Sequence, residues 1–382
     1  MATFEFTQLR KQYENFSYPF SVVEINNKDI SKDKNGLAVS DLNIELTSGF
    51  EASIASFTIY NCYNRHNSQF EITKVKKYIM IGSLVKIFLG YGRSCREVFR
   101  GFISGIRFFS NEYEIPGIEI TAMDVKGIMM ANNNSYQLKA EYFSDAVREI
   151  LQKKAYTGLK TASVINKLDI SATPDKTSPA AGQTKASDRT VEMVCESDYE
   201  FVVKAAKKYN YEFFSLGGTV YFRKAKENKD ILLEAAPNTG LKGYEITYDI
   251  TGQTEAIEVR SMDPGKAQLI STQSRVNQKI SQQNQAKNLI KQSKKSYIDP
   301  TVSSQKEAQY RLDYLKEEMM FRFGNLEAEF IGLPELVPGR FIKMKELGSM
   351  VSNTFYLVSV THKMDTESGF VTYIKGRASG LE

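Results

Sequence analysis

Residues 42–46 of this 382-residue chain read Leu-Asn-Ile-Glu-Leu, so apolar and polar side chains alternate. A period of two places one set of side chains on each face of a β-strand, which predicts a strand with one buried face. Turn signals such as Gly90-Tyr91-Gly92 and Pro116-Gly117 separate this run from others like it. The similar runs contain Phe57/Ile59, Val85/Ile87/Leu89, Phe102/Ile106/Phe108 and Ile118/Ile120/Ala122. Short strands at this spacing predict an antiparallel sandwich or small barrel over roughly the first 125 residues.

A different pattern follows between about residues 130 and 235. Residues 144–155 carry apolar side chains at helical spacing, and Ser197 and Glu200 form a capping box that starts a second helix. Residues 171–187 are small, polar and proline-containing, which predicts a loop. Gly217-Gly218 separates two aromatic runs and predicts a hairpin. This stretch is therefore expected to be a small α/β unit.

Strand alternation returns at residues 244–259 and again at 326–374, so an insertion from about 262 to 322 splits a second β unit. The insertion ends in a predicted helix that starts with a capping box of Ser304 and Glu307. Its apolar stripe is spaced four, three and four residues apart: Ala308, Leu312, Leu315 and Met319. The expected fold class is mainly β with α+β insertions.

Composition narrows the possible functions. The chain has 50 Lys and Arg against 45 Asp and Glu, a net charge of +5, which is too balanced for a surface that attracts nucleic acid or membrane everywhere. No apolar run is long enough to span a membrane, and the N-terminus lacks a signal peptide pattern. The only histidines are His66 and His362, and the cysteines are Cys62, Cys95 and Cys195. We therefore expect no catalytic residue, no metal site and no cofactor.

Two apparent site motifs have simpler interpretations. Gly90-Tyr91-Gly92-Arg93 is not followed by a Lys-Ser/Thr pair, so it predicts a turn between strands rather than a phosphate loop. The carboxylate pairs Glu317-Glu318 and Glu327/Glu329 lie on a predicted helix and strand, with no sign of a cleft between them. We expect His362 to have a structural hydrogen-bonding role and the cysteines to act as small core residues.

Three stretches of the chain carry a resemblance to a known family. They are residues 82–93 (GSLVKIFLGYGR) with 98–107 and 118–124; residues 241–254 with 257–266; and residues 332–343 (GLPELVPGRFIK) with 355–363 and 369–372. Their order resembles the baseplate hub family of contractile tails, the phage late-control gene D proteins and the hub part of VgrG proteins. The matching motif residues are Gly82, Gly90, Gly101, Phe102, Asp124, Asp263, Gly332, Pro334, Pro338, Gly339, His362 and Gly369. Ser261-Met262-Asp263 departs from the family, which often has Gly-Trp-Asp there.

The resemblance implies two tube-like antiparallel β-barrel domains, a small α/β domain and a helical insertion. The expected domains are residues 1–128 (first barrel), 129–238 (α/β), 239–262 with 323–382 (second barrel) and 263–322 (Lys/Gln-rich insertion). It further implies a homotrimer whose pseudo-six-fold ring joins a tail tube protein to a spike protein. Since nothing up to Glu382 resembles a spike, we expect the spike to be separate. Other baseplate proteins, wedge or tape-measure-associated, are further expected partners.

The resemblance also implies where the protein is made and assembled, and it leaves two alternative functions open. We expect synthesis in the bacterial cytoplasm without a signal peptide, followed by assembly into the baseplate of a virion, a bacteriocin or a contractile injection system. DNA would meet the protein only in transit, and no membrane contact is expected. The alternatives are a hub with cell-wall hydrolase activity and a nucleic-acid-binding protein.

The first part of the insertion has an unusual charge distribution. Residues 264–298 contain seven Lys or Arg, seven Gln and no Asp or Glu, with only a thin apolar seam. This composition predicts a solvated helix or mobile arm. We hypothesise that the arm contacts an acidic surface or DNA; a solvated insertion without a partner is the alternative. The candidate contact residues are Lys279, Lys287, Lys291, Lys294 and Lys295.

Overall fold

The structure, a computed structural model, describes residues 3–32, 34, 36–174, 176, 190–263, 266–276, 280 and 285–381. Its largest element is a mainly antiparallel sheet, which has 13 strands within those residues. Seven strands come from the first β unit: β1 (Pro19–Ile25), β2 (Lys28–Asp29), β3 (Ala38–Thr47), β4 (Ile54–Tyr60), β7 (Leu84–Tyr91), β8 (Ser94–Phe109) and β9 (Gly117–Met123). Six come from the second: β15 (Ile231–Ala235), β16 (Leu241–Tyr248), β20 (Gly324–Ile331), β21 (Phe341–Met344), β22 (Thr354–Asp365) and β23 (Gly369–Ala378).

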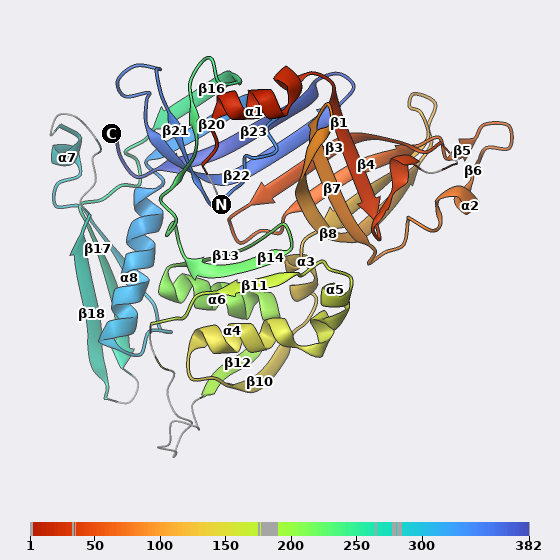
Figure 1. Ribbon diagram of the computed structural model, residues 1–382. Helices are drawn as coiled ribbons and strands as arrows, with labels where there is room; N and C mark the ends of the chain where they lie inside the picture. The colour runs from red at the N-terminus through yellow and green to blue at the C-terminus, as the bar shows by residue number, and fades with distance from the viewer. Residues whose placement is uncertain are drawn as a thin grey trace.

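The two β units are joined edge to edge. The strand order is β16-β20-β23-β22-β3-β4-β9-β8-β7-β1-β2, with β21 beside β22 and β15 beside β21 (Figure 1). The junction is the antiparallel pair β3–β22, in which Ile44 lies opposite His362. Leu42, Ile44 and Leu46 are buried, so the strand predicted from their alternation is confirmed. One apolar core continues through both units. The prediction of a mainly β fold with α insertions is confirmed as well.

Short elements cover the ends of this sheet. Helix α1 (Phe6–Gln12) lies across the second β unit, and its Leu9 is buried in the shared core (Figure 1). The hairpin β5–β6 (Tyr63–Asn64 and Gln69–Phe70) and helix α2 (Ile72–Val75) lie at the far end of the first unit. Within the described residues, no helix has the length and apolarity needed to cross a membrane.

The α/β unit lies below the large sheet in Figure 1 and has a separate apolar core. It contains strands β10 (Asn134–Lys139), β11 (Lys167–Ile170), β12 (Thr190–Glu196), β13 (Tyr211–Leu216) and β14 (Thr219–Lys224), with helices α3 (Lys126–Met129), α4 (Phe143–Gln152), α5 (Thr157–Thr161) and α6 (Asp198–Tyr209). The predicted capping box is confirmed, because Ser197 Oγ accepts from the Glu200 N–H at 3.1 Å and the Glu200 carboxylate accepts from the Ser197 N–H at 2.7 Å. Most of the predicted loop 171–187 falls outside the described residues.

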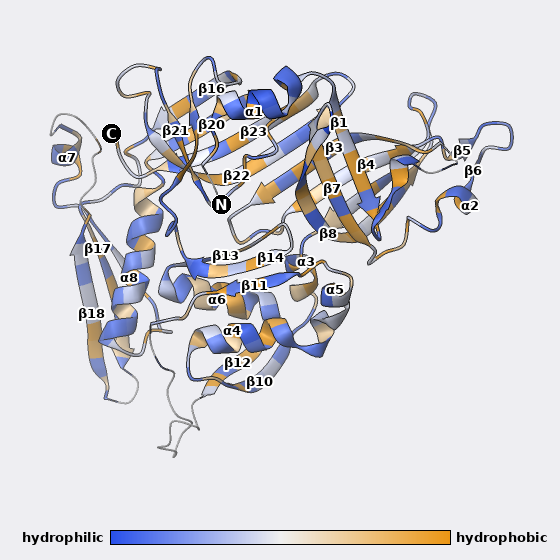
Figure 2. Cartoon of the chain, in the orientation of Figure 1, coloured by the Kyte–Doolittle hydropathy of each residue, from blue (hydrophilic) through white to orange (hydrophobic). Residues whose placement is uncertain are grey.

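The insertion contains a three-stranded sheet of β17 (Ala256–Asp263), β18 (Gln268–Arg275) and β19 (Lys294–Ile298), together with α7 (Gln285–Leu289) and α8 (Gln305–Met320). The expected solvated helix or mobile arm is therefore wrong for residues 268–275 and 294–298, which are strands. β17 pairs with these strands, although its sequence pattern placed it with the second β unit. The strands were missed because polar side chains occupy most of their positions (Figure 2).

The predicted position and apolar stripe of helix α8 are both confirmed. Ser304 Oγ accepts from the Glu307 N–H at 3.2 Å, as the capping pattern predicts. The Glu307 carboxylate differs from that pattern, because it accepts from the Ser303 N–H at 2.9 Å. All four stripe residues, Ala308, Leu312, Leu315 and Met319, are buried against the insertion sheet.

Candidate functional site: three joints between the units

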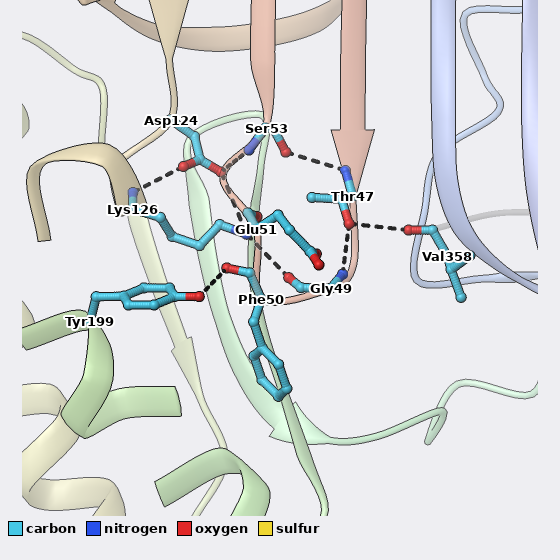
Figure 3. A network of polar contacts seen from close by, with 9 residues as sticks. All are labelled: Thr47, Gly49, Phe50, Glu51, Ser53, Asp124, Lys126, Tyr199 and Val358. Carbon is cyan, nitrogen blue, oxygen red and sulfur yellow. Dashed lines mark hydrogen bonds and ion pairs between the residues drawn. The ribbon is translucent and has the colours of Figure 1, made fainter. Parts of the chain in front are cut away.

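The first joint is the loop at residues 47–53, which connects β3 to β4 (Figure 3). Asp124 follows β9 and Lys126 begins α3, and their side chains are 2% and 0% exposed. The Asp124 carboxylate accepts from the N–H groups of Ser53 at 3.1 Å and Lys126 at 2.9 Å. Lys126 Nζ lies 3.8 Å from Asp124 Oδ2. A buried carboxylate thus has both a counter-charge and backbone donors, which burial requires.

The same lysine holds the backbone of the loop. Lys126 Nζ donates to the carbonyls of Gly49, at 3.2 Å, and Glu51 (Figure 3). Burial raises the pKa of Asp124 and lowers the pKa of Lys126, and the charge of each group opposes the shift of the other. Both side chains thus fix the shape of the loop.

Two further contacts make this loop a three-way connection. The Tyr199 hydroxyl, on α6 of the α/β unit, donates to the Phe50 carbonyl at 3.0 Å. Thr47 Oγ1 donates to the Val358 carbonyl of β22 at 3.3 Å (Figure 3). The loop thus binds the first β unit to both the α/β unit and the second β unit.

The second joint attaches the α/β unit to β22. The carboxylate of Glu212, on β13, accepts from Tyr356 Oη of β22 and from Arg223 Nε at 2.7 Å. Glu212 and Tyr356 are buried. Burial raises the pKa of Tyr356 far above its usual value, and the Glu212 charge adds to this shift. The arginine also donates to the Gly339 carbonyl at 3.2 Å. Gly339 has φ +80°, and a Cβ there would lie 2.9 Å from the Phe214 ring, so only glycine fits.

The third joint is the seam between the two β units. A Cβ on Gly332 would lie 2.1 Å from the ring of Phe370, so the absence of a side chain lets this ring pack over the backbone. The Phe370 ring lies 5.5 Å from the ring of Tyr91, at the end of β7. His362 is 0% exposed, and its Nδ1 lies 3.0 Å from Thr372 Oγ1. Burial lowers the pKa of His362 to about 4, which keeps the ring neutral.

The seam also holds the predicted Pro-Gly motif. Pro334 and Pro338 are buried within the continuous buried stretch 332–340. Glu335 in that stretch accepts from the Tyr13 hydroxyl at 2.6 Å, which ties the N-terminal segment to it. Burial raises the pKa of Glu335, and the Tyr13 hydrogen bond opposes that shift. The structure therefore brings motif residues of both β units together.

The remaining motif residues lie elsewhere in the strands and turns. Gly82 precedes β7, Gly90 and Gly101 lie within β7 and β8, and Gly369 begins β23. Phe102 is buried in a small cluster with Leu84 and Val164. Asp263 ends β17, where its carboxylate accepts from the Lys266 N–H at 3.2 Å. These residues shape the fold separately and do not converge on one site.

The predicted partner-contact lysines stay apart from the joints. Lys279 lies outside the described residues. Lys287 and Lys291 are exposed, on α7 and just after it, while Lys294 and Lys295 begin β19. The structure thus places four of these lysines along the surface of the insertion.

Sequence reasoning missed several residues that build the joints. Glu212 lies within the apolar strand Tyr-Glu-Phe-Phe-Ser-Leu at 211–216, and Lys126 lies beside the apolar run 128–130. A charge within or close to an apolar run is the signal that could have found both, because such a charge needs a buried partner. Within the described residues, no group of three or more His, Cys, Asp or Glu side chains could hold a metal ion.

Two solved structures of tail proteins share this fold. The tail protein from Neisseria meningitidis MC58 superposes with a TM-score of 0.65 at 10% identity, over 95% of this chain and 98% of that one. The 43 kDa tail protein of prophage MuSo2 from Shewanella oneidensis has a TM-score of 0.63 at 11% identity, over 94% and 98%. At these identities the likeness establishes a shared fold.

A third solved structure comes from a secretion system. It is the E. coli c3393 protein, a type VI secretion component described as similar to the T4 tail proteins gp27 and gp5, with a TM-score of 0.55 at 10% identity over 93% of this chain and 76% of that one. A sequence search of curated proteins found no match. The family model that matches, over residues 38–366, is described as the Alg8 N-terminal domain. The chain belongs to this Alg8 N-terminal domain family.

Proposed function

We propose that the chain is a non-enzymatic structural subunit of a contractile-tail baseplate. It acts there as a hub of the late-control gene D or VgrG type, in a phage, a bacteriocin or another contractile injection system. The observation that carries the proposal is the fold shared with two tail proteins over at least 94% of this chain. The description of the matching family names neither a reaction nor a partner.

The joints suit a part that must transmit force. A large sheet with one continuous core connects both β units, and hydrogen bonds from Tyr356 to Glu212 and from Tyr199 to the Phe50 carbonyl attach the α/β unit to it. Close-packed interiors are stiff, so a displacement at one unit would reach the others. In a contracting tail, such a body would carry the movement of the baseplate to the tube and the spike.

Assembly into a trimer is the second element of the proposal. Strand β16 ends the order of the large sheet, and most of its residues are exposed. An unpaired strand edge favours pairing with another chain, and a closed ring of copies satisfies every such edge. A permanent ring would bury on the order of 2,000–5,000 Å² per interface. Tail tube protein, spike protein and neighbouring baseplate proteins would contact this ring after synthesis in the cytoplasm.

Electron microscopy of the purified chain, together with its mass in solution, tests the proposal. We expect a three-fold ring with a central channel and a mass three times that of the 43.3 kDa chain. Co-expression with the tail tube protein of the same particle should increase the trimer fraction if the free chain assembles weakly. A monomer that stays monomeric with tube protein present would overturn the hub assignment.

A further inference from the structure

The insertion sheet has one covered face and one open face. On the covered face, Ile257, Val259 and Ile270 pack against the apolar stripe of α8. Helix α8 lies between this sheet and the rest of the molecule, so the opposite face is directed outward (Figure 1). Because side chains alternate along a strand, the residues on either side of Ile257, Val259 and Ile270 occupy that outer face.

Three large apolar side chains lie at one end of the outer face. Met262 of β17 lies opposite Leu269 of β18, and Ile298 of β19 lies opposite Arg260, the next outward residue of β17. Met262 is 56% exposed, Leu269 66% and Ile298 83%. Single exposed apolar residues are common, whereas three at adjacent positions of one sheet face indicate an interaction surface.

Positive charge dominates the rest of the outer face. Its single carboxylate, Glu258, accepts from Arg260 Nε and Lys294 Nζ, each at 2.9 Å. It also accepts from Ser271 Oγ at 3.1 Å and Ser296 Oγ at 2.8 Å. The hydrogen bond from Lys294 contributes most to lowering the pKa of Glu258, which is about 2. This carboxylate is therefore charged at any physiological pH. Since Arg275 also lies on this face, three cations face one carboxylate.

We propose that the outer face of the β17–β18–β19 sheet is a docking surface for an acidic amphipathic helix of another protein. The apolar trio Met262, Leu269 and Ile298 would contact the apolar stripe of the helix, and Arg260, Arg275 and Lys294 would face its carboxylates. The inference rests on this surface alone and does not depend on the baseplate proposal.

The dimensions of the sheet favour a helix as the occupant. Three strands spaced ~4.8 Å apart are ~10 Å wide between the outer two, which matches the ~10–12 Å diameter of one helix. A sheet covered by a helix on both faces is a common layered arrangement, and α8 already covers the other face. The excess of cations selects an acidic partner. Nucleic acid would use the cations but would leave the apolar trio without a role.

A binding measurement on the full-length chain tests this surface. The probe is a fluorescein-labelled peptide of about 18 residues with leucines at helical i, i+3, i+4 and i+7 spacing and glutamates elsewhere. Its twin has lysine in place of every glutamate. We expect the acidic peptide to bind by fluorescence anisotropy with Kd on the order of 10–100 μM, and the basic twin at least about ten-fold more weakly.

Variants separate the apolar from the ionic contribution. The double variant Met262→Ser/Leu269→Ser should weaken peptide binding about ten-fold or more, because each substitution removes an apolar side chain that would contact the leucines of the peptide. Arg260→Gln with Arg275→Gln should weaken it and reduce its salt dependence. Ile115→Ser, at an apolar residue that is 64% exposed in the first β unit, is the matched control and should leave binding unchanged. Circular dichroism confirms that each variant is folded.

Two outcomes would overturn the inference. One is equal affinity of wild-type protein and the Met262→Ser/Leu269→Ser variant for the acidic peptide. The other is tighter binding of a duplex DNA probe that depends on Arg260 and Arg275 but not on the apolar residues, which would make the face a nucleic-acid surface. The test is independent of the oligomeric state. A chain that stays monomeric with tube protein present but binds the peptide would refute the hub and retain the docking surface.

Discussion

The first joint and the insertion sheet both contain Lys–carboxylate pairs, but they use them in opposite ways. At the joint, Asp124 and Lys126 are both buried, and the lysine donates hydrogen bonds to backbone carbonyls. On the sheet, the Glu258 side chain is 6% exposed, whereas its partner Lys294 is 35% exposed. Removing one partner of an enclosed pair leaves a buried charge, whereas an exposed lysine returns to water.

This difference in burial predicts which parts of the molecule unfold together. The joints connect the first β unit, the second β unit and the α/β unit, which together form the body, so breaking one joint weakens the packing of these three units against one another. The insertion has a core of only eight buried side chains among the described residues. It is held to the α/β unit by contacts such as Lys208–Glu307, at 2.7 Å, and Lys226–Glu317, at 2.8 Å. We therefore expect the insertion to open locally while the body stays folded.

Replacing Lys126 should have the largest effect. Lys126→Met keeps a long apolar side chain but leaves the Asp124 carboxylate buried without a cation and two carbonyls without a donor. Breaking such a pair costs about 3–5 kcal/mol of unfolding free energy. Urea denaturation followed by circular dichroism measures this loss.

Two further variants test whether the loss of stability depends on the burial of the ion pair. Asp124→Asn combined with Lys126→Met should recover part of the lost stability, because no uncompensated charge remains. Lys242→Met removes the partner of Glu329, a pair at 2.6 Å whose side chains are 44% and 34% exposed, and should cost less than about 1 kcal/mol. If Lys126→Met and Lys242→Met cost the same, the contrast between enclosed and exposed pairs would be wrong.

Local features of the fold could be predicted from the sequence. Strand β3 follows from the alternation at residues 42–46, and α6 and α8 follow from their caps at Ser197 and Ser304. Each of these signals lies within a few residues of the structure it predicts. The apolar stripe of α8 was likewise sufficient to identify its buried face.

The joints could not be predicted because they connect distant parts of the chain. Thr47 and Val358 are separated by 311 positions, and Glu212 and Tyr356 by 144. No local pattern encodes which edges of two sheets will pair. Strand β18 was missed for a different reason: Ile270 is its one buried residue, so neither period is visible in its sequence.

Acidification should destabilise the seam by an intermediate amount. The pKa of His362 is about 4 in the folded protein and 6.5 for the ordinary side chain. Between these values the unfolded chain binds a proton that the folded protein does not. The stabilisation is therefore complete above pH 6.5 and declines as the pH falls toward 4, by at most about 3 kcal/mol.

The other histidine provides a control for the substitution itself. His66 is exposed in the β5–β6 hairpin, so His66→Gln should leave the unfolding free energy at neutral pH unchanged. His362→Gln should flatten the pH dependence of the unfolding free energy between pH 6.5 and 4, whatever the stability of that variant at neutral pH. Parallel pH profiles for wild-type protein and His362→Gln would show that the seam histidine does not titrate on unfolding.

The smallest global effect is expected at the attachment of the insertion. Glu317 on α8 accepts from Lys226 at 2.8 Å and from Asn210 at 2.7 Å. In the Glu317→Gln variant, the amide oxygen can still accept a hydrogen bond from Asn210. The Lys226 ammonium also keeps its cation–π contact with Phe321, whose ring centroid lies 4.6 Å away. The unfolding free energy should therefore change by less than about 1 kcal/mol.

Hydrogen exchange should nevertheless detect this change. Amides of α8 and β18 should exchange faster in Glu317→Gln than in wild-type protein, while amides of β3 and β22 keep their rates. Glu327→Gln is the matched control, because its pair with Lys375 is 64% and 65% exposed and lies on the large sheet. Faster exchange in β3 and β22 as well would mean that the insertion and the body open as one unit. That result would extend the cooperative unit of the joints to the insertion.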